Sequence, residues 1–238
     1  IKEIIREGHC GKITRIEASW HRNSNWRREV PSPELERLIN WRLYREYSGG
    51  LMAELGSHQL NMIDNILGDN PLKVVGTGGI NYWEDGRETY DNVLAVYDYP
   101  GGVTASFSSI LANGYEGFRM NFYGDKGTIV SNAMEEAFLY PEKDADKDWV
   151  ENVDGVTGAS IKIIDKNKGR SIMPVENDLV AYPFESNYFN TTWLLYKNFA
   201  GAIKGEEELQ LGLDDGYRSA ISVHMANSAI REEKIVKW

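Results

Sequence analysis

Alternating apolar and polar residues predict a series of short strands in the first 140 residues of this chain. Residues 12–20, KITRIEASW, follow the period of two expected for a strand with one buried face. The Pro-Gly-Gly sequence at 100–102 is typical of a hairpin turn, because proline fixes φ and glycine tolerates positive φ. Between Pro71 and about Tyr140 six strand-like runs recur, which are KVVGTGGINYW, NVLAVYDYP, GVTASFSSIL, FRMNFYG, GTIVSN and AFLY. We expect these strands to form one antiparallel sheet.

The run at 118–123, FRMNFY, has two faces of different character. Phe118, Met120 and Phe122 share one face, which should pack on helices. A broad sheet that lacks helices on one side is often covered by a symmetry mate. We therefore expect a homo-oligomer contact on the opposite face, which carries Arg119, Asn121 and Tyr123.

Helical spacing is strongest in the stretch 51–67, LMAELGSHQLNMIDNIL, which ends at Gly68. Further helices are expected at IKEIIREG, at PELERLI, at 187–204 before Gly205, and from Asp214 or Asp215 to the C-terminus. Residues 141–183 are rich in Asp, Lys, Gly and Asn, and we interpret them as mobile loops around one strand-like stretch, ASIKIID. The fold class is therefore α+β, with an open, mostly antiparallel sheet and helices on one face, in one domain spanning 1–238.

Composition excludes several classes of function. Lys and Arg total 26 against 36 Asp and Glu, and the net charge of -10 disfavours nucleic acid as a partner. No apolar run approaches the roughly 20 residues of a membrane helix, and no export signal opens the sequence. The single cysteine, Cys10, cannot form a disulfide framework. We expect a cytoplasmic protein, with the periplasm as the alternative.

The most informative chemistry lies in GGLMAELGSHQLNMID, at 49–64. In an α-helix, Glu54 and His58 are four residues apart and lie on the same side, close enough for the carboxylate to hydrogen-bond the imidazole. Such a pair is typical of a catalytic base, because the carboxylate fixes the tautomer of the histidine. The same spacing is also common on exposed helix surfaces. Gly49, Gly50 and Gly56 favour the first reading, since small residues allow another group to approach closely.

Aromatic and polar residues suited to carbohydrate gather in two nearby segments, WHRNSNW and NWRLYREY. Aromatic rings stack on the apolar faces of sugars, and His, Asn and Arg hydrogen-bond hydroxyl groups. Each of these residue types is more often structural than ligand-binding. The candidates for substrate binding are His21, Asn23, Trp26, Trp41, Arg42 and Tyr44. Weaker candidates of the same kind are Tyr82, Trp83, Arg87, Tyr90 and Asp91.

The string GGLMAELGSHQLNMIDNILGDNPLKVVG resembles the signature of the glucose-fructose oxidoreductase, inositol dehydrogenase and MocA (Gfo/Idh/MocA) family. EIIREGHCGKITRIEAS is similar to the family's junction between its two domains, and AGAIKGEEELQLGLDDGYRSAISVHMANSAI to its terminal helices. By position, His58 falls on the family's catalytic histidine and Glu54 on its usual aspartate. Asn61 replaces an acid often found three residues after that histidine.

The resemblance implies a substrate-binding and oligomerisation domain whose N-terminal Rossmann partner binds NAD or NADP. Residues 1–10 would be the remnant of the junction, and the start at Ile1 suggests that the Rossmann half is missing. No GxGxxG and no Glu-Lys-Pro motif occurs in the chain. The implied substrate is the secondary alcohol of a sugar, cyclitol or glycoside, and the fragment alone should be inactive.

The sequence is also compatible with other functions. NAD-dependent glycoside cleavage by transient oxidation and elimination would use a similar domain. A non-catalytic carbohydrate-binding or dimerisation module would lack a nucleotide-binding domain altogether. A metal site built from His58, Glu54 and His21 lacks three ligands at convincing spacing, so no metal is expected.

Overall fold

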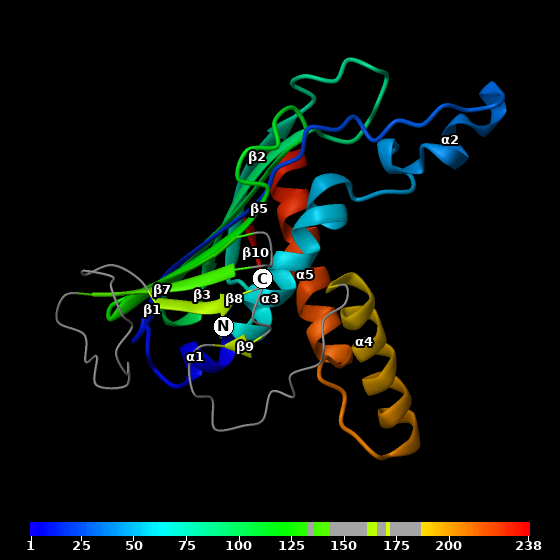
Figure 1. The fold of residues 1–238 in the computed structure, drawn as a ribbon. Helices are drawn as coiled ribbons and strands as arrows, with labels where there is room; N and C mark the ends of the chain where they lie inside the picture. Colours follow the sequence, from blue (N-terminus) through cyan, green and yellow to red (C-terminus); the bar gives the residue numbers. More distant parts are fainter. Residues whose placement is uncertain (133–135, 143–160, 166–169, 172–186) are drawn as a thin grey trace.

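A computed structural model describes residues 1–132, 136–142, 161–165, 170–171 and 187–238, and its described part contains one ten-stranded sheet (Figure 1). The strands are β1 (Ile13–Trp20), β2 (Lys73–Gly79), β3 (Asn92–Tyr99), β4 (Val103–Ile110), β5 (Phe118–Gly124), β6 (Gly127–Asn132), β7 (Glu136–Pro141), β8 (Ile161–Asp165), β9 (Arg170–Ser171) and β10 (Val236–Lys237). The helical segments are α1 (Lys2–Arg6), η1 (Pro33–Leu35), α2 (Glu36–Ile39), η2 (Trp41–Leu43), η3 (Met52–Gly56), α3 (Ser57–Leu67), η4 (Pro100–Gly102), α4 (Asn187–Lys204) and α5 (Leu213–Glu232).

The sheet has the order β10-β2-β3-β4-β1-β5-β6-β7-β8-β9 and is open. All neighbouring strands pair antiparallel except β1 and β4, which are parallel. The expected α+β class with an open, mostly antiparallel sheet is confirmed, and the one parallel pair involves β1, which lies before the six strand-like runs. The chain reaches β4 from β1 through the helical layer and the β2–β3 hairpin, so β4 runs in the same direction as β1.

Helices cover one face of the sheet, and the other face is open (Figure 1). The covered face of β5 carries the buried Phe118, Met120 and Phe122, as the alternation predicted. The PGG turn between β3 and β4 is also confirmed, with φ of 76° at Gly101 and 81° at Gly102. The core therefore lies between the sheet and the layer formed by η3, α3 and α5.

Two chain segments differ from the expected elements. The run INYW at 80–83 is a loop, because Asp91 accepts the backbone N–H groups of residues 81, 82 and 83 and turns the chain away from β2. The last helix ends at Glu232, since Glu233 adopts a left-handed φ of 52°, and residues 236–237 pair with β2 instead.

Glycines lie at the C-terminal end of α4 and at the N-terminal end of α5. Gly212 is the N-cap of α5, and Asp215 contributes by accepting the Gly212 N–H at 2.8 Å. The expected stop of α4 at Gly205 is confirmed by a φ of +73° there. The expected strand ASIKIID appears as β8, and most of the loops expected at 141–183 lie outside the described residues. In the described ranges, no helix is long and apolar enough to cross a membrane.

A buried carboxylate joins the helical layer to the sheet. Asp64 of α3 accepts hydrogen bonds from the Tyr99 hydroxyl at 2.6 Å and from the Ser222 hydroxyl of α5 at 2.9 Å. Burial raises the pKa of Asp64 to about 6, although these two hydrogen bonds and the charge of Arg218 oppose the rise. Burial, and after it the charge of Asp64, raise the pKa of the nearby Tyr97. Three elements therefore meet at one titratable side chain.

Replacing Asp64 by asparagine should raise stability at neutral pH more than at acid pH. An unfolded aspartate titrates near 3.9, below the folded value of about 6, so the ionised group weakens folding as pH rises from about 4 to about 6. The gain in unfolding free energy of Asp64→Asn over the wild type should grow by about 1 kcal/mol between pH 5 and pH 7.5. Urea titrations at both pH values measure it. The exposed Asp69→Asn serves as a control, and an unchanged gain at the two pH values would contradict the assignment.

Candidate active site

His58 stands in the first turn of α3 with its side chain exposed on the helical side of the sheet. Its ring lies against the indole of Trp20, with centroids 5.5 Å apart and planes tilted by 59°. Trp20 in turn contacts Phe118 edge to face at 5.3 Å, and the Arg22 guanidinium lies 5.7 Å from the indole. The imidazole is thus supported on one side by a fixed aromatic surface and remains open to solvent on another.

The expected hydrogen bond between Glu54 and His58 is not formed, so this prediction is wrong. Arg42 Nε donates to one oxygen of the Glu54 carboxylate at 2.8 Å, and the Ser48 hydroxyl donates to the other at 3.1 Å. Residues 52–56 form a π turn, which has more residues per revolution than an α turn and changes the angle between Glu54 and His58. Glu54 therefore links the helix to the segment 41–48 rather than orienting the imidazole.

Glycines allow this helix to begin and to approach the sheet. Gly50 has a φ of +67°, a conformation that favours glycine, directly before the π turn. A Cβ added at Gly56 would lie 3.0 to 3.3 Å from three ring atoms of Phe107 in β4. The close approach expected of these glycines is therefore present, and its partner at Gly56 is a core side chain. This contact between Gly56 and Phe107 sets how close the start of α3, which carries His58, lies to the sheet.

The segment 24–48 extends away from the sheet as an arm that includes η1, α2 and η2 (Figure 1). Arg42 stacks on Trp41 with 4.5 Å between the guanidinium carbon and the ring centroid, so these two candidates lie beside Glu54. Tyr44 is buried and donates its hydroxyl to Glu36 at 2.8 Å within the arm. Trp26 packs partly buried against the core at a φ of 61°, and Asn23 is exposed beside Ala112.

Ion pairs attach the arm to the loop 80–91. Arg27 and Arg87 both hydrogen-bond the carboxylate of Asp85, at 3.2 Å and 2.8 Å respectively. Burial alone would raise the pKa of Asp85, but the hydrogen bonds from Arg87 and Arg27 outweigh it and lower the value to about 2. The weaker candidates of this loop mostly contact other parts of the protein. Arg87 is buried, the Trp83 indole N–H donates to Leu111 O, and Asp91 accepts backbone N–H groups of the loop. Tyr90 stacks with Arg45, whereas Tyr82 is exposed.

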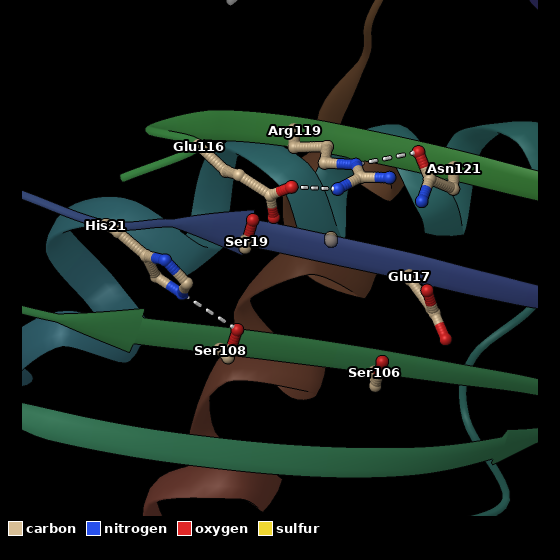
Figure 2. A pocket seen from close by; sticks show the side chains of 9 residues that line it. Glu17, Ser19, His21, Ser106, Ser108, Glu116, Arg119 and Asn121 are labelled. Atoms are coloured by element: carbon tan, nitrogen blue, oxygen red, sulfur yellow. Dashed lines mark hydrogen bonds and ion pairs between the residues drawn. The ribbon is translucent and has the colours of Figure 1, made fainter. Parts of the chain in front are cut away.

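His21 lies on the opposite face of the sheet from His58. Its Nε2 is 3.2 Å from the Ser108 hydroxyl (Figure 2). Its Nδ1 is 3.1 Å from Tyr115 O. Trp20 points to the covered face, so the next residue along the strand points to the open face. The structure therefore separates His21 from His58, and the contacts of Glu54, Arg42 and Trp41 with one another do not include either histidine.

A hollow of about 210 Å³ surrounds His21 on the open face. Small side chains of the adjacent strands β1 and β4 form its floor, and larger polar groups stand around it (Figure 2). Arg119 bonds to Glu116 on one side and to Asn121 at 3.2 Å on the other. Sequence reasoning missed most of the lining, which comprises Glu17, Ala18, Ser19, His21, Ser106, Ser108, Glu116, Arg119 and Asn121. The alternation of serines in TASFSS was the available signal.

The described residues fit one part of a redox site. No loop among them joins a strand to a helix through the glycine pattern that binds a dinucleotide. Over the same residues, no group of three or more His, Cys, Asp or Glu side chains could hold a metal. What the chain offers is a polar and aromatic surface around an exposed imidazole, which suits the alcohol side of a hydride transfer.

The described fold is an open sheet with one helical layer, and the exposed His58 lies at the head of α3. The chain matches the sequence profile of the GFO/IDH/MocA C-terminal domain over residues 1–130, and it belongs to this family. The expected family is confirmed. A curated relative, "Putative oxidoreductase YteT" of Bacillus subtilis (strain 168), is 24% identical over 217 aligned residues, which cover 60% of this chain and 48% of the relative.

Solved structures share the fold across the whole chain. Levoglucosan dehydrogenase in complex with NADH superposes with a TM-score of 0.74 at 17% identity, covering 99% of this chain and 61% of that one. Aldose-aldose oxidoreductase from Caulobacter crescentus, complexed with glycerol, gives 0.66 at 18% identity, covering 100% and 59%. The chain thus spans about half the length of the curated relative and about three fifths of these two solved chains.

Proposed function

We propose that this chain is the substrate-binding domain of a nicotinamide-dependent oxidoreductase that oxidises a secondary alcohol of a sugar, cyclitol or glycoside. The observation that carries the proposal is the exposed imidazole of His58, seated against Trp20 within the family's signature helix. Levoglucosan dehydrogenase, which shares the fold, forms complexes with NADH, levoglucosan and L-sorbose. NAD or NADP, when bound, accepts hydride from the carbon of the alcohol.

In the proposed reaction His58 accepts the proton of the substrate hydroxyl. The Trp20 ring restricts the orientation of the imidazole, a task that the sequence suggested for Glu54. Glu54 instead hydrogen-bonds Arg42, which stacks on the Trp41 ring. A guanidinium and an indole placed together provide hydrogen bonds to hydroxyl groups and an apolar surface for the C–H faces of a sugar. Glu54 is thus a positioning residue for substrate.

The test is a hydride-transfer screen on the natural polypeptide that contains residues 1–238. Sugars, cyclitols and glycosides are each offered with NAD and with NADP, and absorbance of the reduced cofactor is followed. Cofactor reduction by a polyol or sugar supports the proposal and selects the cofactor. Release of the aglycone from a glycoside without net cofactor reduction would replace it by redox-assisted glycoside cleavage. Absence of both reactions, together with absence of cofactor binding, would leave a carbohydrate-binding module.

We also propose that the open face of the sheet joins two copies of this chain. Asn121 donates to the Tyr123 hydroxyl at 3.0 Å, and that hydroxyl donates to Glu17 at 2.8 Å, so the face presents an ordered polar network. Exposed Val75 and Leu94 extend it with apolar surface. Such a mixture of polar and apolar groups fits an interface between subunits.

Light scattering of the natural polypeptide should therefore give a dimer or a larger even assembly. Leu94→Arg should reduce the measured mass, because a charge placed on this face must be desolvated on association. Leu38→Arg, on the distant arm, should leave the mass unchanged. A strict monomer of the wild type at high concentration would refute the contact.

A further inference from the structure

The residue that follows His58 in α3 is a buried glutamine. Gln59 is 0% exposed, whereas His58 itself is exposed. The Gln59 Nε2 donates to Ser19 O at 2.7 Å and to Arg119 O at 3.1 Å. Because both partners are carbonyl oxygens, the atom between them must be the amide nitrogen, and both of its protons are used. Gln59 therefore fastens the first turn of α3 to the strands β1 and β5.

The two carbonyl groups belong to strand positions whose side chains point away from the helix. Ser19 and Arg119 stand opposite each other in the register of β1 and β5. Both side chains line the hollow on the open face (Figure 2). On the covered side their backbone carries no side chain of its own, so an amide from the helical layer can reach it. Gln59 thus contacts the sheet at one particular pair of residues.

The next pair in the same register carries the rings that support His58. Trp20 stands opposite Phe118, and their rings contact edge to face at 5.3 Å. The imidazole of His58 lies against the Trp20 indole, with 5.5 Å between the centroids. Gln59 directly follows His58 along the helix, and its two carbonyl partners directly adjoin the two aromatic residues along the strands. One side chain therefore connects the base with the strands that carry its support.

Other polar contacts of α3 hold the helix to different elements. The Ser219 hydroxyl of α5 donates to Ser57 O at 3.2 Å. Asp64 accepts hydrogen bonds from β3 and from α5. These contacts fix the helix against α5 and β3, whereas those of Gln59 go to β1 and β5. The distance of the imidazole from the Trp20 ring therefore depends on Gln59 more directly than on these other contacts.

We infer that Gln59 is a positioning residue that holds the His58 imidazole against Trp20 for proton transfer. Breaking a buried hydrogen bond leaves polar groups without water, so the amide and the two carbonyl groups resist separation. Rates depend steeply on position, and a displacement of about 1 Å at the reacting group can lower the rate by about 10²-fold. This inference rests on the proposed function, in which His58 accepts the proton of the alcohol.

The variant Gln59→Met in the natural polypeptide tests the inference, because methionine is similar in length and cannot donate a hydrogen bond. Its kcat for alcohol oxidation should fall about 10- to 10²-fold, with little change in the KM of the alcohol. Ile63→Val is the matched control. It removes one methylene group from the same buried side of α3, so it should lower stability and keep the wild-type kcat. Wild-type kcat in Gln59→Met, or an equal loss in both variants, would overturn the inference.

The position of the imidazole can also be followed without turnover. NMR of the natural polypeptide with labelled histidine detects the ring protons of His58, which the Trp20 indole shifts and which are assigned by their loss in His58→Ala. In Gln59→Met these signals should move toward those of the exposed His224, and in Ile63→Val they should stay in place. A merely structural role would lower stability without moving them. Unmoved signals in Gln59→Met would therefore contradict the positioning role.

The wild type supplies a measurement that does not depend on the folding of a variant. Both Nε2 protons of Gln59 are buried and bonded to carbonyl groups, so they should exchange with solvent at least tenfold more slowly than those of the exposed Gln210. Equal exchange of the two side-chain amides would overturn the inference.

The failure of this inference differs from the failure of the proposed function. Normal turnover of the wild type, with unchanged kcat and unmoved His58 signals in Gln59→Met, would remove the positioning role alone. Absence of hydride transfer in the wild type with every substrate and cofactor would remove the proposed function and, with it, the role of Gln59 in holding a base.

Discussion

Replacing His58 by alanine in the natural polypeptide should slow hydride transfer by about 10²- to 10⁴-fold, the usual contribution of a positioned base. The imidazole is the exposed titratable group at the head of the signature helix, and its contact with Trp20 fixes its place. The loss should appear in kcat, because alanine removes the proton acceptor and leaves the surrounding sheet and helix unchanged. Steady-state rates at saturating alcohol and cofactor measure it.

Two further variants test whether the loss of kcat in His58→Ala comes from the loss of the proton acceptor. His58→Phe retains a flat ring against Trp20 without a nitrogen, so it should be as slow as the alanine variant if proton transfer is the role. His224→Ala removes another exposed histidine, on α5, and should keep the wild-type rate. Wild-type turnover in either variant of His58 would refute its assignment as the base.

Gly56→Leu should destabilise the domain by about 3 kcal/mol, the scale of overpacking in a core. The reason is the Phe107 ring, which lies 3.0 Å from the position of an added Cβ and is itself fully buried in β4. Either the helix must move away from the sheet or the ring must leave its place. Since His58 follows two residues later, activity should fall together with stability. Chemical denaturation of the purified domain measures the first effect.

The matched control is Gly216→Leu in α5, where an added Cβ meets no atom within 4 Å. That variant should be as stable as the wild type or slightly more so, because leucine has a higher helix propensity than glycine. Equal stability of the two leucine variants would show that the contact between Gly56 and Phe107 does not limit the approach of the helix to the sheet.

Periodicity in the sequence predicted the strands well because each has one face in the core. The alternation in NVLAVYDY and VTASFS follows directly from burial of every second residue in β3 and β4. The parallel pairing of β1 with β4 could not be read in this way, since the same alternation fits either direction. INYW was assigned to a strand on its apolar composition, and the carboxylate of Asp91 decides otherwise.

The candidate site shows a similar limit. A π turn contains one extra residue per turn, and no residue type in MAELG announces it, so the spacing of Glu54 and His58 was misleading. The separation of His21 from His58, by contrast, was available in the sequence. Trp20 shares its strand face with Ala18 and Ile16, which places its neighbour His21 on the opposite face.

The position of β1 in the middle of the sheet has a consequence for synthesis on the ribosome. Among the described strands β1 comes first in the sequence, yet its neighbours are β4 and β5, which begin at Val103 and Phe118. The backbone N–H and C=O groups of β1 can pair only after β4 and β5 have been synthesised, and pairing across such sequence separations is slow. The edge of β2 waits longer still, for Val236 and Lys237 at the far end of the chain. Nascent chains should therefore expose unpaired strands throughout translation, and folding chaperones that recognise them should bind during that interval.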